Sequence, residues 1–263
     1  MNFGLKNKIA VVTAASQGLG KASAWALAQE GATVVMCSRR QKEISEAAKE
    51  IHDATGAVVV PVVADVTKPA DIKRLVAEAK KQFGTIHVLV NNAGGPPTGT
   101  IASLSDEEWR SGHELTLMSM VRLTREILPI MTEQRWGRII TIVSIVAKQP
   151  INELLLSSAI RPGILGLTKV LANLHAKDNI TVNTVCPGHI LTKRQEELAA
   201  SRGAQKNMTM AEYLQAAARE IPAGRLGKPE EIGHTVAFLA SEQASYINGV
   251  NLLVDGSAAK GIH

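Results

Sequence analysis

The sequence predicts a single α/β domain, built on a doubly wound parallel sheet of about seven strands with helices on both faces. Short runs rich in Val and Ile alternate with periodic helical segments along the whole chain, as βαβ units do. Most of these runs lack polar alternation, which is typical of strands that are buried on both faces. With 263 residues, the chain is long enough to bury one large core.

Seven apolar runs mark the expected strands in chain order. They cover residues 8–13, 33–37, 58–64, 87–91, 138–144, 180–186 and 250–254. Periodic segments between them predict helices, among them 19–30, 70–83 and 230–240. Parallel strands need right-handed crossovers, and these place helices on both faces of the sheet.

The segment 188–223 departs from this regular alternation. It is long, polar and partly helical, and it follows the end of a strand. Ligands in open α/β sheets bind beyond the carboxyl ends of the strands, so this segment is a candidate lid over a substrate site, with a surface excursion as the alternative. Since no linker, repeat or low-complexity segment is present, residues 1–263 are expected to form one domain.

Composition and charge limit the classes of function. The formal charge is +5, but the lysines and arginines are scattered and no nucleic-acid motif is present, so we expect no nucleic-acid partner. Cys37 and Cys186 lie in apolar runs, which predicts core positions and a reducing compartment rather than a metal site. The first residues lack a basic leader pattern, and no apolar run approaches the about 18 residues that span a bilayer. A cytoplasmic protein without a membrane partner is expected.

A glycine-rich turn follows the first strand and opens the first helix. Small residues at such a turn let the backbone approach a pyrophosphate, and the helix N-terminus offers free N–H groups to it. The position at the start of a βαβ unit is the one that a Rossmann-type dinucleotide site requires. An ordinary tight turn is the alternative. The residues expected to hold the cofactor here are Thr13, Ala15, Ser16, Gln17, Gly18, Leu19 and Gly20.

The end of the second strand indicates which nicotinamide cofactor is bound. About twenty residues after the glycine-rich turn, a carboxylate would bind the ribose 2′-hydroxyl of NAD. The chain instead has Ser38, Arg39 and Arg40, which suit the 2′-phosphate of NADP through charge-assisted hydrogen bonds. NADP is therefore preferred over NAD, although these arginines could also belong to a solvated turn.

Several further motifs, in a fixed order, resemble those of the short-chain dehydrogenase/reductase family. The glycine-rich turn resembles that family's TGxxxGxG loop with Ala14 in place of one glycine, and Arg225–Glu231 and Val254–Gly256 resemble its C-terminal signature. The chain is most similar in type to the 3-oxoacyl-acyl-carrier-protein reductases, which implies a small-molecule or acyl-thioester substrate. The resemblance implies further cofactor contacts at Asp65, Val66, Asn91, Ala93, Gly94, Pro187, Gly188, Ile190 and Thr192.

The same resemblance implies four catalytic positions, and this chain departs from three of them. Ser144 matches the family's serine, but Thr116 stands at the asparagine position, seven residues after Trp109. Ser157 stands where the family has its tyrosine, and Arg161 where it has its lysine. A serine hydroxyl is a far weaker acid than a phenol, and its side chain is shorter, so the expected proton donor is missing. Arg161 can still offer a charged donor fork to a ribose or a carboxylate.

Two readings of this site remain open. The chain is either an oxidoreductase acting on a carbonyl or alcohol with a non-standard proton donor, or a cofactor-binding sensor, scaffold or partner subunit without catalysis. His189 and Lys148 are the preferred alternative donors, because His189 adjoins the expected nicotinamide and Lys148 flanks the substrate region. The other positional candidates are His113, Glu153 and Lys193, for which structural or solvated roles are the alternative.

Two long helices, about 107–134 and 154–176, resemble the pair through which the family forms dimers. A homodimer or homotetramer is therefore expected. The apolar stripe on the first of them is assigned to the core or to a subunit interface, and the tryptophans to packing. The stripe comprises Leu115, Met118, Val121, Leu123 and Ile127, and the tryptophans are Trp25, Trp109 and Trp136.

Overall fold

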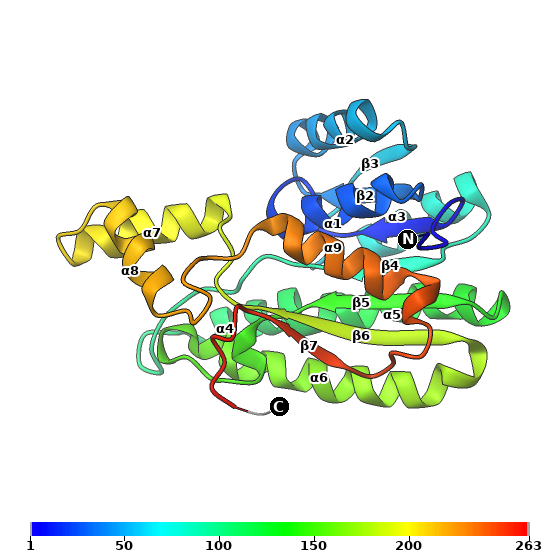
Figure 1. The fold of residues 1–263 in the computed structure, drawn as a ribbon. Helices are drawn as coiled ribbons and strands as arrows, with labels where there is room; N and C mark the ends of the chain where they lie inside the picture. Colours follow the sequence, from blue (N-terminus) through cyan, green and yellow to red (C-terminus); the bar gives the residue numbers. More distant parts are fainter. Residues whose placement is uncertain (1, 262–263) are drawn as a thin grey trace.

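The computed structural model describes residues 2–261 and contains the predicted seven-stranded sheet (Figure 1). The strand order is β3-β2-β1-β4-β5-β6-β7, and every neighbouring pair is parallel. The strands are β1 (Ile9–Val12), β2 (Thr33–Ser38), β3 (Val59–Val63), β4 (Val88–Asn91), β5 (Gly137–Ile142), β6 (Ile180–Pro187) and β7 (Asn251–Val254).

Helices connect the strands and cover both faces of the sheet. One layer contains α1, α2 and α9, and the other contains α3, α5 and α6 (Figure 1). The helices are α1 (Gly18–Gln29), α2 (Gln41–Thr55), α3 (Pro69–Phe83), α4 (Asp106–His113), α5 (Ser119–Glu133), α6 (Leu155–His175), α7 (Lys193–Gln205), α8 (Met210–Arg219) and α9 (Pro229–Ala240). Short turns of helix complete the set: η1 (Glu114–Met118), η2 (Ile145–Ala147), η3 (Asn152–Leu154), η4 (Ala176–Asp178) and η5 (Glu242–Ala244).

Two apolar cores lie on the two faces of the sheet. Alternate residues of one strand enter opposite cores: Val12 of β1 packs under α1 and α9, whereas Val11 packs with α3 and α5. This is why the strands read as continuous apolar runs in the sequence. Cys37 and Cys186 are both buried with free thiols, as core positions predict, and burial raises the pKa of Cys37 to about 12.

The strand order reverses direction between β1 and β4. The chain moves outward from β1 to β3, then returns to the other side of β1 to begin β4. At such a switch point the connections leave in opposite directions, so the carboxyl ends of β1 and β4 border a crevice. The segments that follow these two strands carry Thr13, Ala15–Gly20, Ala93 and Gly94 of the predicted cofactor residues.

One expectation about a helix needs correction. The helix expected over 107–134 is divided into α4, the π-helical turn η1 and α5. A π-helical turn has one extra residue per turn, which sequence periodicity does not show, and it places Thr116 in the irregular part. Within the stripe on this helix, Leu123 and Ile127 are in the core, while Met118 and Val121 are half-buried.

One helical segment is long and apolar enough by composition to span a bilayer, although charged residues interrupt its apolar run. Within Asn152–Asp178, an 18-residue window has a mean hydropathy of 1.4. Its glycines, alanines and leucines are interrupted by few charges, among them Arg161 and Lys169. In the structure this segment is η3, α6 and η4, and α6 packs along β6 as a layer of the domain (Figure 1).

Candidate active site

Helix α1 begins without a side-chain cap. Its N-cap residue, Gln17, makes no capping hydrogen bond, and the first turn has no acidic residue. By contrast, α4 and α8 both begin with complete capping boxes, Ser105 with Glu108 and Thr209 with Glu212. The first N–H groups of α1 are therefore available to an anionic group, and the helix dipole favours one there. The residues present fit the phosphates of a dinucleotide.

The turn before α1 is fixed to the end of β4 by a set of hydrogen bonds. The Asn92 amide group donates to the carbonyls of Thr13 and Ala14, at 3.3 and 3.2 Å, and the hydroxyl of Thr13 donates to the Asn92 carbonyl at 2.7 Å. Gly20 leaves no room here, since a Cβ atom on it would lie 2.5 Å from the Ala14 carbonyl oxygen and 2.7 Å from Asn92 Nδ2. The turn is thus held in its shape by the protein alone.

Ala14 occupies a strained conformation in this turn. Its φ is 47°, in the left-handed region that glycine adopts freely and alanine disfavours. This is the position at which the sequence has alanine in place of a glycine of the TGxxxGxG pattern. Its neighbour Ala15 is buried and donates its backbone N–H to the Cys37 carbonyl at 2.9 Å, which ties the turn to β2 as well.

The segment after β6 reaches back to the start of α1. Thr192 caps α7 by accepting a hydrogen bond from the Gln195 backbone, and its methyl group lies 3.7 Å from where a Cβ on Gly18 would be. Gly188 packs against Asp255, which leaves no room for a side chain there. Ile190 is buried and pairs with Gly227 in an isolated bridge. The predicted residues of the β1 and β6 loops therefore lie on one edge of the sheet.

The predicted ribose and adenine contacts lie at the ends of β2 and β3. Arg39 and Arg40 are exposed, and Arg40 forms an ion pair with Glu43 at 3.0 Å. Asp65 is half-buried and its carboxylate accepts from the backbone and hydroxyl of Thr67 at 3.0 and 2.8 Å. The Val66 side chain is buried. Asp65 therefore shapes its own loop.

The four predicted catalytic positions lie on three elements around the ends of β4, β5 and β6. Ser144 follows β5, caps η2 and accepts from the Val146 backbone at 3.3 Å. Thr116 is in η1, and Ser157 and Arg161 are one turn apart in α6; all three are at least nine-tenths buried. The guanidinium of Arg161 donates to the carbonyl of Val143, directly before Ser144.

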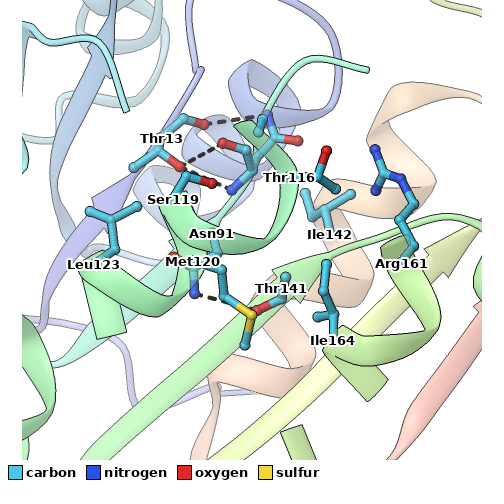
Figure 2. A pocket seen from close by; sticks show the side chains of 12 residues that line it. Thr13, Asn91, Thr116, Ser119, Met120, Leu123, Thr141, Ile142, Arg161 and Ile164 are labelled. Atoms are coloured by element: carbon cyan, nitrogen blue, oxygen red, sulfur yellow. Dashed lines mark hydrogen bonds between the residues drawn. The ribbon is translucent and has the colours of Figure 1, made fainter. Parts of the chain in front are cut away.

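A small cavity of about 10 Å³ lies between η1, α5, α6 and the ends of β4 and β5 (Figure 2). Thr116 and Arg161 line it, as does Asn91, whose amide donates to Thr141 at 3.3 Å. Among residues 2–261, three buried polar atoms of these side chains have no protein partner: Asn91 Oδ1, Thr116 Oγ1 and Arg161 Nε. Figure 2 shows the Arg161 side chain rising from α6 to the level of Thr116. Ser144 and Ser157 do not line this cavity.

The pKa of Arg161 is lowered from its usual value to about 10, chiefly because the side chain is buried. The nearby Cys186 opposes this shift, and the charge of Arg194 adds a smaller lowering effect. Burial also raises the pKa of Cys186, against the effects of a Thr184 hydrogen bond and of the nearby Lys148 and Arg161 charges. With its pKa near 10, Arg161 is charged at neutral pH.

The alternative proton donors differ in how far they are exposed to solvent. His113, Glu153, His189 and Lys193 are exposed, whereas Lys148 is half-buried in the loop after η2. Lys148 is also the candidate whose charge reaches Cys186 at the end of β6. Asn92, which lies in the Asn91–Gly94 motif but was assigned no contact, fixes the glycine-rich turn, whereas Arg194, which the sequence did not select, places its guanidinium against Gly95. The double asparagine after β4 was a usable signal for the first, but nothing in the sequence marked the second.

Comparisons with known proteins agree with this geometry. Residues 13–258 match the model of a family described as enoyl-(acyl carrier protein) reductase. The chain is 37% identical over 256 residues to the 3-oxoacyl-[acyl-carrier-protein] reductase FabG of Escherichia coli, covering 97% of this chain and 98% of that protein. It is 36% identical to dehydrogenase/reductase SDR family member 4 of Oryctolagus cuniculus, covering 97% and 94%.

Among solved structures, the chain resembles L-sorbose reductase from Gluconobacter frateurii in complex with NADPH and L-sorbose. The TM-score is 0.96, with 35% identity and full coverage of both chains. The same likeness extends to an actinorhodin polyketide ketoreductase with NADPH, at a TM-score of 0.93 and 32% identity over 97% of this chain and 98% of that one. This chain therefore belongs to the short-chain dehydrogenase/reductase family and is an oxidoreductase of that type.

Proposed function

We propose that this protein is an NADP(H)-dependent oxidoreductase that transfers hydride between the nicotinamide and a carbonyl or alcohol of a small-molecule or acyl-thioester substrate. The uncapped N-terminus of α1, fixed to β4 through Asn92, is the observation that carries the proposal. The cofactor supplies the hydride when it is bound. The chain supplies a rigid place for its phosphates and the hydroxyl of Ser144 beside the reacting carbon.

Preference for NADP over NAD is part of the proposal. Arg39 has no ion-pair partner among residues 2–261, and Ser38 lies beside it at the carboxyl end of β2. A 2′-phosphate there would form charge-assisted hydrogen bonds with both. Fluorescence titration should give a lower Kd for NADPH than for NADH, and Arg39→Ala should remove most of the difference. Equal binding of both cofactors by the unaltered protein would contradict this preference.

The proton is proposed to come from Lys148 or His189, because Ser157 is short and a poor acid. Lys148 is favoured by its half-buried position and by its charge near Cys186 at the end of β6. Ser144 would hydrogen-bond the substrate oxygen, and Thr116 would have no acid role. Turnover of Lys148→Met and His189→Gln on an active substrate tests this assignment. If both variants keep full kcat, neither side chain is the donor.

The segment 188–223 is proposed to act as a lid over the substrate. It contains α7 and α8, which extend away from the sheet beyond the end of β6 (Figure 1). None of the residues of α8 is buried, so this helix has little packing to hold it in one position. Hydrogen exchange in α7 and α8 should slow when cofactor and substrate are both bound.

The first experiment is an NADPH titration followed by turnover on 3-oxoacyl thioesters, ketones and quinones. Tight binding with turnover supports the enzyme. Tight binding without turnover on any compound favours the alternative, a cofactor-binding sensor, scaffold or partner subunit. The absence of the family's tyrosine and lysine at Ser157 and Arg161 is the observation that favours the alternative.

A homodimer or homotetramer in the cytoplasm is also proposed. Val170 and Leu174 of α6 are 54% and 58% exposed, and Gly163 and Gly166 have open space at their Cβ positions. An exposed apolar helix face with small residues can pack against a second copy. Leu174→Glu should shift the mass measured by light scattering toward the monomer. A monomeric unaltered protein would rule out this face as an interface.

A further inference from the structure

The guanidinium of Arg161 is a buried charge without a counter-ion. The side chain is 8% exposed, its only hydrogen bond among the described residues is to the Val143 carbonyl, and its Nε has no partner. None of the ion pairs formed within residues 2–261 includes it. A buried charge is costly unless it is paired, so the site is suited to an anion.

The neighbouring charges strengthen this requirement. The Arg194 guanidinium lies against Gly95, after β4, with its Nη2 3.2 Å from where a Cβ on that glycine would be. Arg194 and Lys148 are, like Arg161, absent from the ion pairs within the described part of the chain. Asp255, which packs against Gly188, accepts from the backbones of Ser257 and Ala259 at 3.0 and 2.8 Å, and it forms no ion pair with these cations among the described residues. Arg161, Arg194 and Lys148 are thus three cations of this region without an ion-pair partner among the described residues.

Position separates this charge from the phosphates of the cofactor. The pyrophosphate is expected at the start of α1, which follows β1, and the 2′-phosphate at Arg39, which follows β2. Arg161 contacts the end of β5, and β4 lies between β1 and β5 in the sheet. Adjacent strands are about 4.8 Å apart, so Arg161 lies on the order of 10 Å from the pyrophosphate position, beside the predicted catalytic residue Ser144.

We propose that Arg161, supported by Arg194, binds a carboxylate of the substrate, so that this protein acts on oxo acids rather than on neutral ketones or thioesters. A guanidinium matches a carboxylate with two parallel hydrogen bonds, which a lysine at this position cannot provide. The proposal rests on the proposed function, because it names the substrate of that site. It also gives the replacement of the family's lysine a chemical purpose.

The test compares acids with their methyl esters in binding, without the need for turnover. Acetoacetate and methyl acetoacetate, and pyruvate and methyl pyruvate, are titrated by calorimetry into protein saturated with NADP⁺. The acids should bind at least about tenfold more tightly than the esters, as one charge-assisted hydrogen bond suffices to give. Arg161→Met should abolish this preference, and Arg161→Lys should restore part of it. Lys169→Met, which removes an exposed charge from the same helix, should leave it unchanged.

Two results would overturn the proposal. One is equal affinity for acid and ester, or no binding of any acid, in the unaltered protein. The other is a parallel loss of NADPH and acid affinity in Arg161→Met while its circular dichroism is unchanged, which would assign the anion to the cofactor. If the unaltered protein does not bind NADP⁺ at all, the proposed function fails. The acid and ester comparison is then made on the protein alone and still decides the proposal.

Discussion

The two halves of the sheet edge differ in how their buried polar groups are satisfied. On the β1 side, Thr13, Ala14 and Asn92 form a closed set of hydrogen bonds that shapes the turn before α1. On the β5 side, Asn91, Thr116 and Arg161 line a cavity, and each has a buried polar atom without a hydrogen-bond partner among residues 2–261. The polar groups of the β1 side are therefore satisfied by hydrogen bonds within the protein. Those of the β5 side are left for water or a ligand to satisfy.

This difference indicates which half has changed its chemistry. Replacement of residues that shape the turn would damage the fold itself, so cofactor binding resists change. Replacement of residues that point into a cavity costs the fold less, and it changes which substrate group is favoured. The family's nucleotide site and a different reacting site can therefore occupy one sheet edge.

The largest expected effect comes from returning the missing acid. Ser157→Tyr with Arg161→Lys should raise kcat on a 3-oxoacyl thioester by roughly 10²–10⁴, the usual contribution of a positioned acid. The kcat is measured from the rate of NADPH oxidation. A matched control places the tyrosine one residue on, as Ser158→Tyr with Arg161→Lys, which should gain nothing. A double variant that binds NADPH but gains no activity would show that the β5 half has changed shape as well as chemistry.

The sequence predicts features of the sheet edge that depend on residues close together in the chain, and it does not predict those that depend on residues far apart. The strands and the glycine-rich turn follow from local patterns, and the structure contains them, whereas the role of Ser144 is implied by the family resemblance and stays a prediction. The partnerless atom of Thr116 depends on the π-helical turn, which leaves no mark on periodicity. Arg194 approaches Gly95 across nearly a hundred residues of chain, and its charge acts on Arg161 through tertiary structure that local sequence patterns do not show.

Crowding at Gly20 provides the next test of the β1 half. Gly20→Ala places a Cβ 2.5 Å from the Ala14 carbonyl, so the turn must shift; unfolding free energy should fall by about 1–3 kcal/mol. NADPH affinity should fall more than about tenfold, since the turn no longer fits the phosphates. Gly233→Ala is the matched control, because its Cβ would lie 2.4 Å from the Ala22 carbonyl, away from the cofactor. It should lose similar stability in denaturant titration and keep NADPH affinity.

A residue at the opposite edge of the sheet, where the strands begin, should determine how the stability of the protein changes at acidic pH. His87 precedes β4, its Nδ1 accepts from the Ile9 backbone at 3.0 Å, and burial lowers its pKa from 6.5 to about 4. The folded state then binds fewer protons than the unfolded state between these values. Stability is present in full above pH 6.5 and falls as the pH falls toward 4. His87→Asn keeps a hydrogen-bond acceptor but does not titrate. It should make the thermal midpoint of unfolding depend less on pH between 4 and 6.5.

Glu231 should affect stability in a second, lower range of pH, and it therefore serves as a control for His87. Two hydrogen bonds from Arg225, at 2.6 and 2.9 Å, lower its pKa from 4.5 to about 2. Its stabilisation is present above pH 4.5 and is lost as the pH falls toward 2. Glu231→Gln should therefore change the midpoint profile only in this lower range. If His87→Asn leaves the slope between pH 6.5 and 4 intact, the proton uptake belongs to another group.

The smallest expected effect lies in the strained residue of the β1 half. Ala14 has a φ of 47°, and glycine adopts this conformation without a steric penalty. Ala14→Gly relieves that strain but gives the unfolded chain more freedom, so the net gain should be about 0.5–1 kcal/mol in denaturant titration. Ala15→Gly, at a buried neighbour with an ordinary φ, should instead destabilise the protein. If Ala14→Gly is destabilising, packing of the alanine methyl group outweighs the backbone strain. Side-chain packing as well as backbone hydrogen bonds would then stabilise the turn.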